Sequence, residues 1–470
     1  MTDDEHPNKS EDELHRRAKK LLNTGVEAFR RGDYSEALSS FESALALCRE
    51  LPGTEHDQAN CLYNSGVALG ESGDCRGALE RFDQALALCR ELPGTERDHI
   101  GCLNGSGVAL GESGDWRGAL ERFDQALALC RGVPGSERNQ ADCLNNSGNA
   151  LSELGDLRGA LERYDRALAL CRGVPGTERN QAYCLYNSGN ALKRLGDLRG
   201  ALERYDRALA LYRGVPGTER NQAYCLFNSG FALEESGDLR GALERFDRAL
   251  VLHRGVPGTE RNQADCLFKS GNALKRLGDL RGALERYDRA LALYRGVPGT
   301  ERNQAYCLFN SGFALEESGD LRGALERFDR ALVLCRGVPG TERDQADFLF
   351  NSGNALSELG DWRGALGRYE RASALFQGIP GGECDHARCL FNSGVALGKL
   401  GDWRGAMRIF ERALKPLNQH ILEVDWIEVE RIGACCVQGI GACLFNLNEA
   451  VFPDHFARAL EVFQRPEHVD

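Results

Sequence analysis

The stretch that decides the fold is Thr218–Pro257, with the sequence TERNQAYCLFNSGFALEESGDLRGALERFDRALVLHRGVP. It contains two segments with apolar residues at helical spacing, and Gly237-Asp238 separates them. A glycine at this position can adopt the left-handed conformation that ends a helix, and the aspartate after it can cap the next helix. Pro257 ends the second segment, because proline has no N–H and clashes with the preceding helical turn. The stretch therefore predicts a hairpin of two helices.

The ends and the contact face of this hairpin can also be predicted. We expect Thr218 to be the N-cap of the first helix, its hydroxyl accepting a hydrogen bond from an early N–H. The first helix should run to about Ser236 and the second to about Arg254. Gly230 and Ala242 lie on the apolar faces. Their small side chains should let the two helices approach closely, so a bulky substitution there should separate them.

The hairpin repeats along the chain with a fixed period. The Gly-Asp turn recurs ten times, each time after 41 residues, and a Pro-Gly linker recurs nine times in the same register. A chain of 470 residues would ordinarily suggest several domains, but repeats stack on their neighbours without one large core. The aspartates of the turns are Asp33, Asp74, Asp115, Asp156, Asp197, Asp238, Asp279, Asp320, Asp361 and Asp402.

The hairpin resembles the tetratricopeptide repeat family. The residues that carry the resemblance are Leu226, Gly230, Leu233, Gly237-Asp238, Ala242, Phe246 and Ala249. The family's usual repeat has about 34 residues, and the longer repeat here resembles those of kinesin light chains and spindle-orientation adaptors. The resemblance implies an all-α fold: a right-handed superhelical solenoid of ten antiparallel helix hairpins with period 41, plus a degenerate C-terminal helical cap.

Three segments follow from where the period begins and ends. Residues 1–11 are polar, and we expect them to be disordered. Residues 12–417 form the solenoid, and residues 418–466 form the cap, in which Ile421–Phe445 and His455–Gln464 have helical patterns. Terminal repeats are usually atypical, because they cover a face that would otherwise be exposed. An interaction tail is the alternative for this last segment.

Composition excludes several function classes. The net charge is -12 and no basic stripe is evident, so nucleic acid is not an expected partner. No apolar run reaches the ~18 residues that span a bilayer, and the first residues carry no apolar signal core. We therefore expect a cytoplasmic protein without membrane insertion.

No catalytic or metal-binding motif is recognisable. The chain has no phosphate-binding loop, no zinc motif and no nucleophile turn, so we expect neither an enzyme nor a cofactor. The 18 cysteines include no CxxC pair. We expect them to be small buried thiols at close helix contacts.

The candidate binding face lies on the first helices, which line the concave surface in the family that the chain resembles. Tyr224, Phe227 and Phe231 share one helical face, apart from the packing residues Leu226 and Gly230. An asparagine follows the position of Phe227 in most repeats, and its amide can pair with a peptide backbone in either sense. The candidate peptide-binding residues are Asn64, Asn146, Asn187, Asn228, Asn310, Asn351 and Asn392, with the aromatic residues Tyr186, Tyr224, Phe227, Phe231, Phe268, Tyr306, Phe309, Phe313 and Phe350.

A structural interpretation of the same residues is open. The aromatic side chains can instead pack between neighbouring first helices, and the asparagines can bond locally. Charges at the ends of these helices alternate, with Lys193-Arg194, Glu234-Glu235, Lys275-Arg276 and Glu316-Glu317 in successive repeats. They predict either a salt-bridge ladder between repeats or a preference for charged ligands.

These observations predict a protein–protein interaction scaffold or adaptor. Its partners would be proteins or peptide segments, bound in extended form along the concave face of the first helices. The alternative is a regulatory, non-catalytic subunit of a larger enzyme or signalling assembly.

Overall fold

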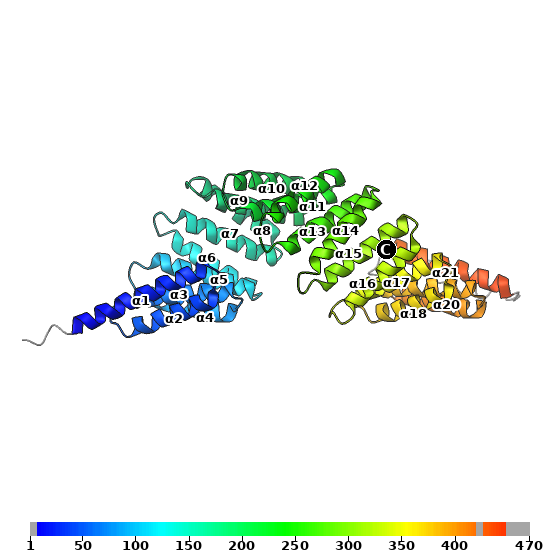
Figure 1. Cartoon of the computed structure of the whole chain (residues 1–470), viewed down its shortest axis with the longest axis horizontal. Coiled ribbons are helices and arrows are strands. Elements are labelled where there is room, and N and C mark those ends of the chain that lie inside the picture. Colours follow the sequence, from blue (N-terminus) through cyan, green and yellow to red (C-terminus); the bar gives the residue numbers. More distant parts are fainter. Residues whose placement is uncertain (1–6, 420–425, 448–470) are drawn as a thin grey trace, which may run out of the picture. The chain divides into compact units, whose positions relative to one another are not determined.

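The computed structural model of the chain describes residues 7–419 and 426–447 (Figure 1). These residues form 21 helices, and no strand occurs among them. The chain divides after Gly237 into two compact units, each of which is described by itself. Consecutive helices pair as hairpins, as the sequence predicts.

The first unit contains five hairpins and the first helix of the sixth. Its helices are α1 (Pro7–Arg30), α2 (Tyr34–Arg49), α3 (Glu55–Glu71), α4 (Cys75–Glu91), α5 (Glu96–Glu112), α6 (Trp116–Cys130), α7 (Glu137–Glu153), α8 (Leu157–Arg172), α9 (Glu178–Arg194), α10 (Leu198–Arg213) and α11 (Glu219–Glu235).

The second unit contains the second helix of the sixth hairpin, four further hairpins and one more helix. Its helices are α12 (Leu239–Arg254), α13 (Glu260–Arg276), α14 (Leu280–Tyr294), α15 (Glu301–Glu317), α16 (Leu321–Cys335), α17 (Glu342–Glu358), α18 (Trp362–Gln377), α19 (Glu383–Lys399), α20 (Trp403–Gln419) and α21 (Trp426–Leu447).

The Gly-Asp turn has the conformation that the sequence predicts. Gly196 ends α9 with a φ of 84°, in the left-handed region that favours glycine. The side chain of Asp197 then accepts a 2.9 Å hydrogen bond from the backbone N–H of Gly200 in the first turn of α10. The same cap recurs at the other Gly-Asp turns, so each turn both ends one helix and begins the next.

The threonine that precedes most of the first helices has a different role from the predicted one. Thr218 stands at the N-cap of α11, but its side chain makes no cap hydrogen bond. Its buried hydroxyl instead donates to the carbonyl oxygens of Tyr212, at 2.6 Å, and Val215, at 2.7 Å. The tight linker brings the hydroxyl beside the last turn of α10, whose carbonyls have no helical partner. The threonine therefore joins consecutive hairpins.

Close contact between the helices of a hairpin depends on a glycine. A Cβ atom on Gly189 of α9 would lie 2.7 Å from the ring of Tyr205 in α10, and Gly271 has the same relation to Tyr287. Both tyrosine rings are fully buried. These glycines occupy the register of Gly230, so the prediction of a small residue at the hairpin contact is confirmed in these repeats.

The two ends of the array differ from the predicted segments. Helix α1 begins at Pro7, inside the stretch 1–11 that we expected to be disordered.

At the other end, helix α21 packs against α19 and α20, with Cys436 buried. Cys436 occupies the register of Cys389 after six additional residues, and a Cβ on Gly439 would lie 2.8 Å from Phe410. We infer that α21 is the first helix of a degenerate eleventh hairpin. The predicted helix His455–Gln464 lies outside the described residues.

The cysteines are free thiols, and all except Cys75, Cys384 and Cys435 are buried. Within residues 7–419 and 426–447, no group of three or more potential ligands could hold a metal ion. In the same part of the chain, no helix is both long and apolar enough for a membrane span.

Candidate functional site

The predicted binding residues lie on a surface formed by the first helices. Within each unit, first helices of successive repeats contact one another, as α5 does with α7 and α13 with α15. Residues at the same register therefore line up from one repeat to the next. All the predicted asparagines and aromatic residues lie on these helices and are partly buried, except Asn187 and Phe350, which are buried.

The aromatic residues at the register of Phe227 pack inside their own hairpins. The ring centroid of Tyr186 lies 5.9 Å from that of Tyr205, and the centroids of Phe268 and Tyr287 are 5.8 Å apart. Phe309 contacts Phe328 in the same way, at 5.5 Å. Neither of the two sequence interpretations described this arrangement. In this arrangement Tyr186, Phe268 and Phe309 are each partly buried.

Phe309 makes a further contact that ties two repeats together. Its ring centroid lies 4.7 Å from that of Phe348 on α17 and 4.6 Å from that of Phe313 on its own helix. Phe350 is 8% exposed and lies under the guanidinium of Arg388, whose central carbon is 4.6 Å from the ring centroid. These two predicted binding residues are therefore also part of the packing.

Lysine side chains cover the aromatic residues at the next turn of the surface. The Nζ atom of Lys193 lies 5.3 Å from the ring centroid of Phe231, and that of Lys275 lies 5.1 Å from that of Phe313. Arg194 donates to the Ser152 carbonyl on the preceding first helix at 2.9 Å. For Lys193 and Lys275, the contact with the neighbouring repeat is thus an aromatic ring rather than the predicted carboxylate.

The asparagine amides form hydrogen bonds between repeats and within helices. Asn187 donates to Asn145 at 3.2 Å and to Asn149 at 3.1 Å, both on the preceding first helix. Asn228 donates to the hydroxyl of Tyr186 at 2.8 Å and to the carbonyl of Tyr224 at 3.1 Å. Asn146 and Asn392 also donate to the preceding first helix, whereas Asn64, Asn310 and Asn351 donate to the carbonyl four residues earlier.

These bonds limit the hydrogen bonds that the asparagine side chains can form with a ligand. An asparagine amide has two N–H donors and one oxygen acceptor, and Asn187 and Asn228 use both donors within the protein. A peptide would meet the amide oxygens, which accept from its N–H groups. The sequence predicts that each asparagine can both donate to and accept from a peptide backbone. At Asn187 and Asn228, only the accepting role remains.

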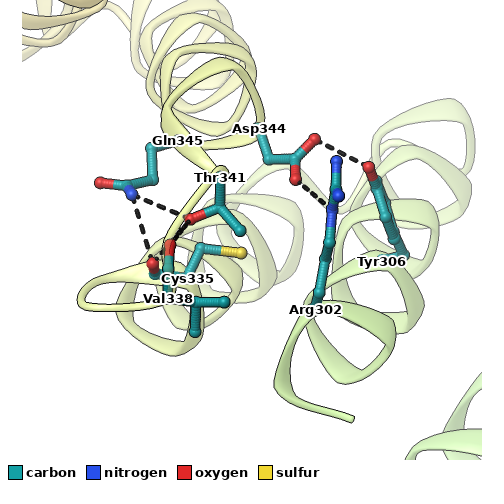
Figure 2. Close-up of polar contacts among 7 residues, drawn as sticks. All are labelled: Arg302, Tyr306, Cys335, Val338, Thr341, Asp344 and Gln345. Atoms are coloured by element: carbon teal, nitrogen blue, oxygen red, sulfur yellow. Dashed lines mark hydrogen bonds and ion pairs between the residues drawn. The ribbon is translucent and has the colours of Figure 1, made fainter. Parts of the chain in front are cut away.

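A buried aspartate joins two first helices in the second unit (Figure 2). Asp344 of α17 is 7% exposed and accepts from the Tyr306 hydroxyl and from Arg302 Nε, each at 2.7 Å. One repeat later, Arg343 donates to Asp385 at 2.8 Å. The sequence analysis missed this network, although an arginine and an aspartate at the start of successive first helices are its visible signal.

Burial changes the protonation of nearby carboxylates on the same surface. Loss of solvent, followed by the charge of Asp385, raises the pKa of Asp347 to about 6. Burial likewise raises the pKa values of Asp142 and Asp265, which occupy the same register. Asp265 also accepts a hydrogen bond from the Tyr294 hydroxyl. This register therefore holds carboxylates that are less acidic than usual.

A cavity opens at the same register in the third repeat. Gly101 of α5 stands where Tyr224 and Tyr306 stand in their repeats, and a cavity of about 250 Å³ remains beside it. Asn60 and Tyr63 of α3 line it, with Cys89 of α4, Arg97 of α5 and Asn139 of α7. A cavity of the same volume recurs one repeat earlier, beside Asn60. The sequence signal is a glycine at a register that holds a tyrosine in three other repeats, as Tyr183, Tyr224 and Tyr306.

A second ladder that the sequence analysis missed runs along the second helices. Arg163 donates to Asp124 at 2.6 Å and 3.3 Å, and Arg286 donates to Asp247 at 2.6 Å and 3.0 Å. Each arginine reaches the equivalent helix of the preceding hairpin, 39 residues earlier. Paired N–H donors match the two carboxylate oxygens, so the ladder sets the register between second helices.

Comparison with known proteins identifies the family. Residues 17–91, 100–173, 144–214, 180–254, 222–296, 263–337 and 344–415 match the model of the tetratricopeptide repeat. The chain belongs to the tetratricopeptide repeat family. No protein of curated function matches it in sequence.

The chain is also similar to solved structures. The apo form of the quorum sensor NprR from B. thuringiensis is 14% identical, with a TM-score of 0.51, and the match covers 77% of this chain and 99% of that one. Kinesin light chain TPR-like repeats from Podosopora anserina are 15% identical over 43% of this chain and 98% of that one, with a TM-score of 0.37.

Proposed function

We propose that the chain is a cytoplasmic adaptor whose first-helix surface binds extended peptide segments of partner proteins. The observation that carries the proposal is the alignment of half-buried aromatic rings and polar side chains along successive first helices. Rings supply apolar contact area with few rotatable bonds, and amide oxygens accept from a peptide backbone. This role requires no catalytic group.

Exposed apolar residues on the first helices support the choice of this surface. Tyr183 of α9 is 42% exposed and Val108 of α5 is 41% exposed, and they occupy the registers of Tyr224 and Phe231. Asn146 of α7 lies between these two helices on the same surface, and Asn64 of α3 precedes them. A peptide that crosses α5–α9 would cover both apolar side chains.

The test is selection of linear peptides from a displayed random library on the full chain. We expect enriched peptides whose affinity falls at least fivefold in Tyr183→Ala, while the melting temperature stays near that of the unmodified protein. The matched control is Val333→Ala, which removes a side chain 61% exposed on the second helix α16. Phe309→Ala is unsuitable, because its contacts with Phe328 and Phe348 make it part of the packing.

Two results would contradict the proposal. One is a library without any enriched peptide, which would favour a folded partner and the alternative of a regulatory subunit. The other is an equal loss of peptide affinity in Tyr183→Ala and Val333→Ala, which would place binding outside the first-helix surface.

A further inference from the structure

The cavity beside Gly101 has a counterpart that the chain itself fills. At the boundary between the seventh and eighth repeats, Tyr294 of α14 and Tyr306 of α15 occupy the registers that Cys89 of α4 and Gly101 of α5 hold at the boundary between the second and third repeats. Tyr294 is 1% exposed, and Tyr306 is partly buried. Replacement of two phenol side chains by a thiol and a hydrogen atom accounts for an open space of about 250 Å³.

Tyr294 and Tyr306 show how a phenol is held at these registers. The Tyr306 hydroxyl donates to Asp344 of the next first helix, α17, and the Tyr306 ring lies 5.7 Å from the central carbon of the Arg302 guanidinium (Figure 2). The Tyr294 hydroxyl donates to Asp265 of α13, the first helix of its own hairpin. Each phenol thus has a carboxylate acceptor on a first helix.

The cavity in the third repeat keeps the polar groups that serve these phenols. Asn60, Arg97 and Asn139 line it, and they occupy the registers of Asp265, Arg302 and Asp344. An asparagine oxygen accepts from a hydroxyl as a carboxylate does. The polar groups that would surround a phenol are therefore present at this cavity, but no phenol side chain of the protein fills it.

The charged groups at the cavity are of opposite sign, which favours an uncharged ligand. Arg97 and Asp98 both line it, with Arg97 donating to the carbonyl of Pro134 at 3.2 Å and Asp98 lying 3.2 Å from His56 Nε2. A charged ligand would meet a like charge as well as an opposite one, and burial of its charge would cost free energy. The volume is also sufficient, because a cavity of about 150 Å³ accommodates benzene.

We propose that the cavity beside Gly101 binds the tyrosine side chain of a partner peptide. The ring lies between Tyr63 and Arg97, and the hydroxyl donates to Asn139, as the Tyr306 hydroxyl donates to Asp344. This inference rests on the proposed peptide-binding function and names the side chain that one repeat selects.

The test uses N-acetyl-tyrosinamide as the probe, with the phenylalanine and leucine amides as comparisons. Binding to the full chain is followed by broadening of the ligand's proton NMR signals. We expect saturable binding of the tyrosine amide, several-fold tighter than that of the phenylalanine amide and tighter still than that of the leucine amide.

Two substitutions at one position provide a matched pair. Gly101→Tyr fills the cavity from within, and we expect it to weaken tyrosine amide binding at least tenfold. Gly101→Ala also removes the glycine, but it leaves most of the cavity open, so binding should persist. Both should fold, because Gly101 lies within a helix and a Cβ there would meet only the Tyr63 ring, at 3.5 Å.

A third variant keeps the inference testable if Gly101→Tyr does not fold. Asn139→Leu removes the hydroxyl's acceptor, and we expect it to abolish the preference for the tyrosine over the phenylalanine amide. Absence of saturable binding, equal affinity for the two aromatic amides, or unchanged binding in Gly101→Tyr would overturn the inference. If the selected peptides bind Gly101→Tyr with the same affinity as the unmodified protein, the cavity is not part of the peptide-binding site. That result would leave the proposed adaptor function intact.

Discussion

The Tyr306 hydroxyl on α15 donates to the Asp344 carboxylate on α17 across a repeat boundary, and Arg302 shares the same carboxylate. Because Asp344 is 7% exposed, its loss would leave the partly buried Tyr306 hydroxyl without its acceptor, whereas the Arg302 side chain, 52% exposed, can donate to water. We expect Asp344→Ala to destabilise the second unit by about 1–3 kcal/mol. Thermal unfolding, with hydrogen exchange of α15 and α17, measures the effect.

The control for this prediction is an ion pair whose carboxylate is more exposed. Asp288 pairs with Arg327 at 2.6 Å, and the Asp288 side chain is 50% exposed. Asp288→Ala should cost less than about 1 kcal/mol, since water replaces the lost partner. Equal losses in the two variants would show that the burial of Asp344 does not strengthen its contacts.

The raised pKa of Asp347 predicts a pH-dependent stability. The pKa of Asp347 is about 6 in the folded protein, against an ordinary value of 3.8. Between these two pH values the folded protein therefore binds more protons than the unfolded chain. The free energy of unfolding therefore falls as the pH rises through this window. Because Asp347 is partly solvated, we expect the loss to be about 1–2 kcal/mol.

The variant Asp347→Asn isolates this contribution from other carboxylates. The amide carries no charge at any of these pH values, so the variant should be more stable than the unmodified protein at pH 8 and lose that advantage near pH 4. Melting temperatures of the two proteins across this range measure the difference. A constant difference would contradict the raised pKa.

The Gly-Asp turn predicts a loss of stability when the aspartate that caps the second helix is removed. Asp361 accepts from the backbone N–H of Gly364 at 2.9 Å, and we expect Asp361→Ala to cost about 1 kcal/mol. Asp361→Ser should retain most of the stability. Gly364→Ala should also be destabilising, because its Cβ would meet the Asp361 carboxylate. Urea denaturation compares the three, and an unaffected Asp361→Ala would show that the bond contributes nothing.

Substitution of glycine by alanine should change the stability in opposite directions at two glycines of the first helices. In Gly189→Ala, the new Cβ would lie 2.7 Å from the buried Tyr205 ring, and we expect a loss of about 1–3 kcal/mol. In Gly101→Ala, the nearest ring atom would be 3.5 Å away. Higher helix propensity should then stabilise the protein by about 0.5–1 kcal/mol. Melting temperatures that shift in the same direction would contradict the structural assignment of these glycines.

Local sequence was sufficient for the architecture of this chain. The Gly-Asp turn, with Gly196 and Asp197 as an example, depends on one residue that adopts a positive φ and one that caps a helix. Both properties belong to the residues themselves, and repetition at one period extends them along the array. The ten hairpins and their boundaries could therefore be predicted before any packing was known.

The candidate binding surface was only partly predictable, because each side chain there has several partners within reach. Spacing places Phe309 and Asn228 on the first-helix surface, but it does not decide whether a ring turns into its own hairpin or an amide bonds to the next helix. Thr218 is the clearest case, since its hydroxyl can cap α11 and instead donates to α10.

The sequence by itself determined the repeat, the turns and the helices of this protein, because these follow from backbone preferences and apolar spacing within a single hairpin. Only the tertiary structure decided which groups bond across repeats and where space remains unfilled. The buried Asp344 network and the cavity beside Gly101 both depend on residues about 40 positions apart that meet when hairpins stack. Such contacts depend on side-chain volume and direction at the interface, which no periodic pattern specifies.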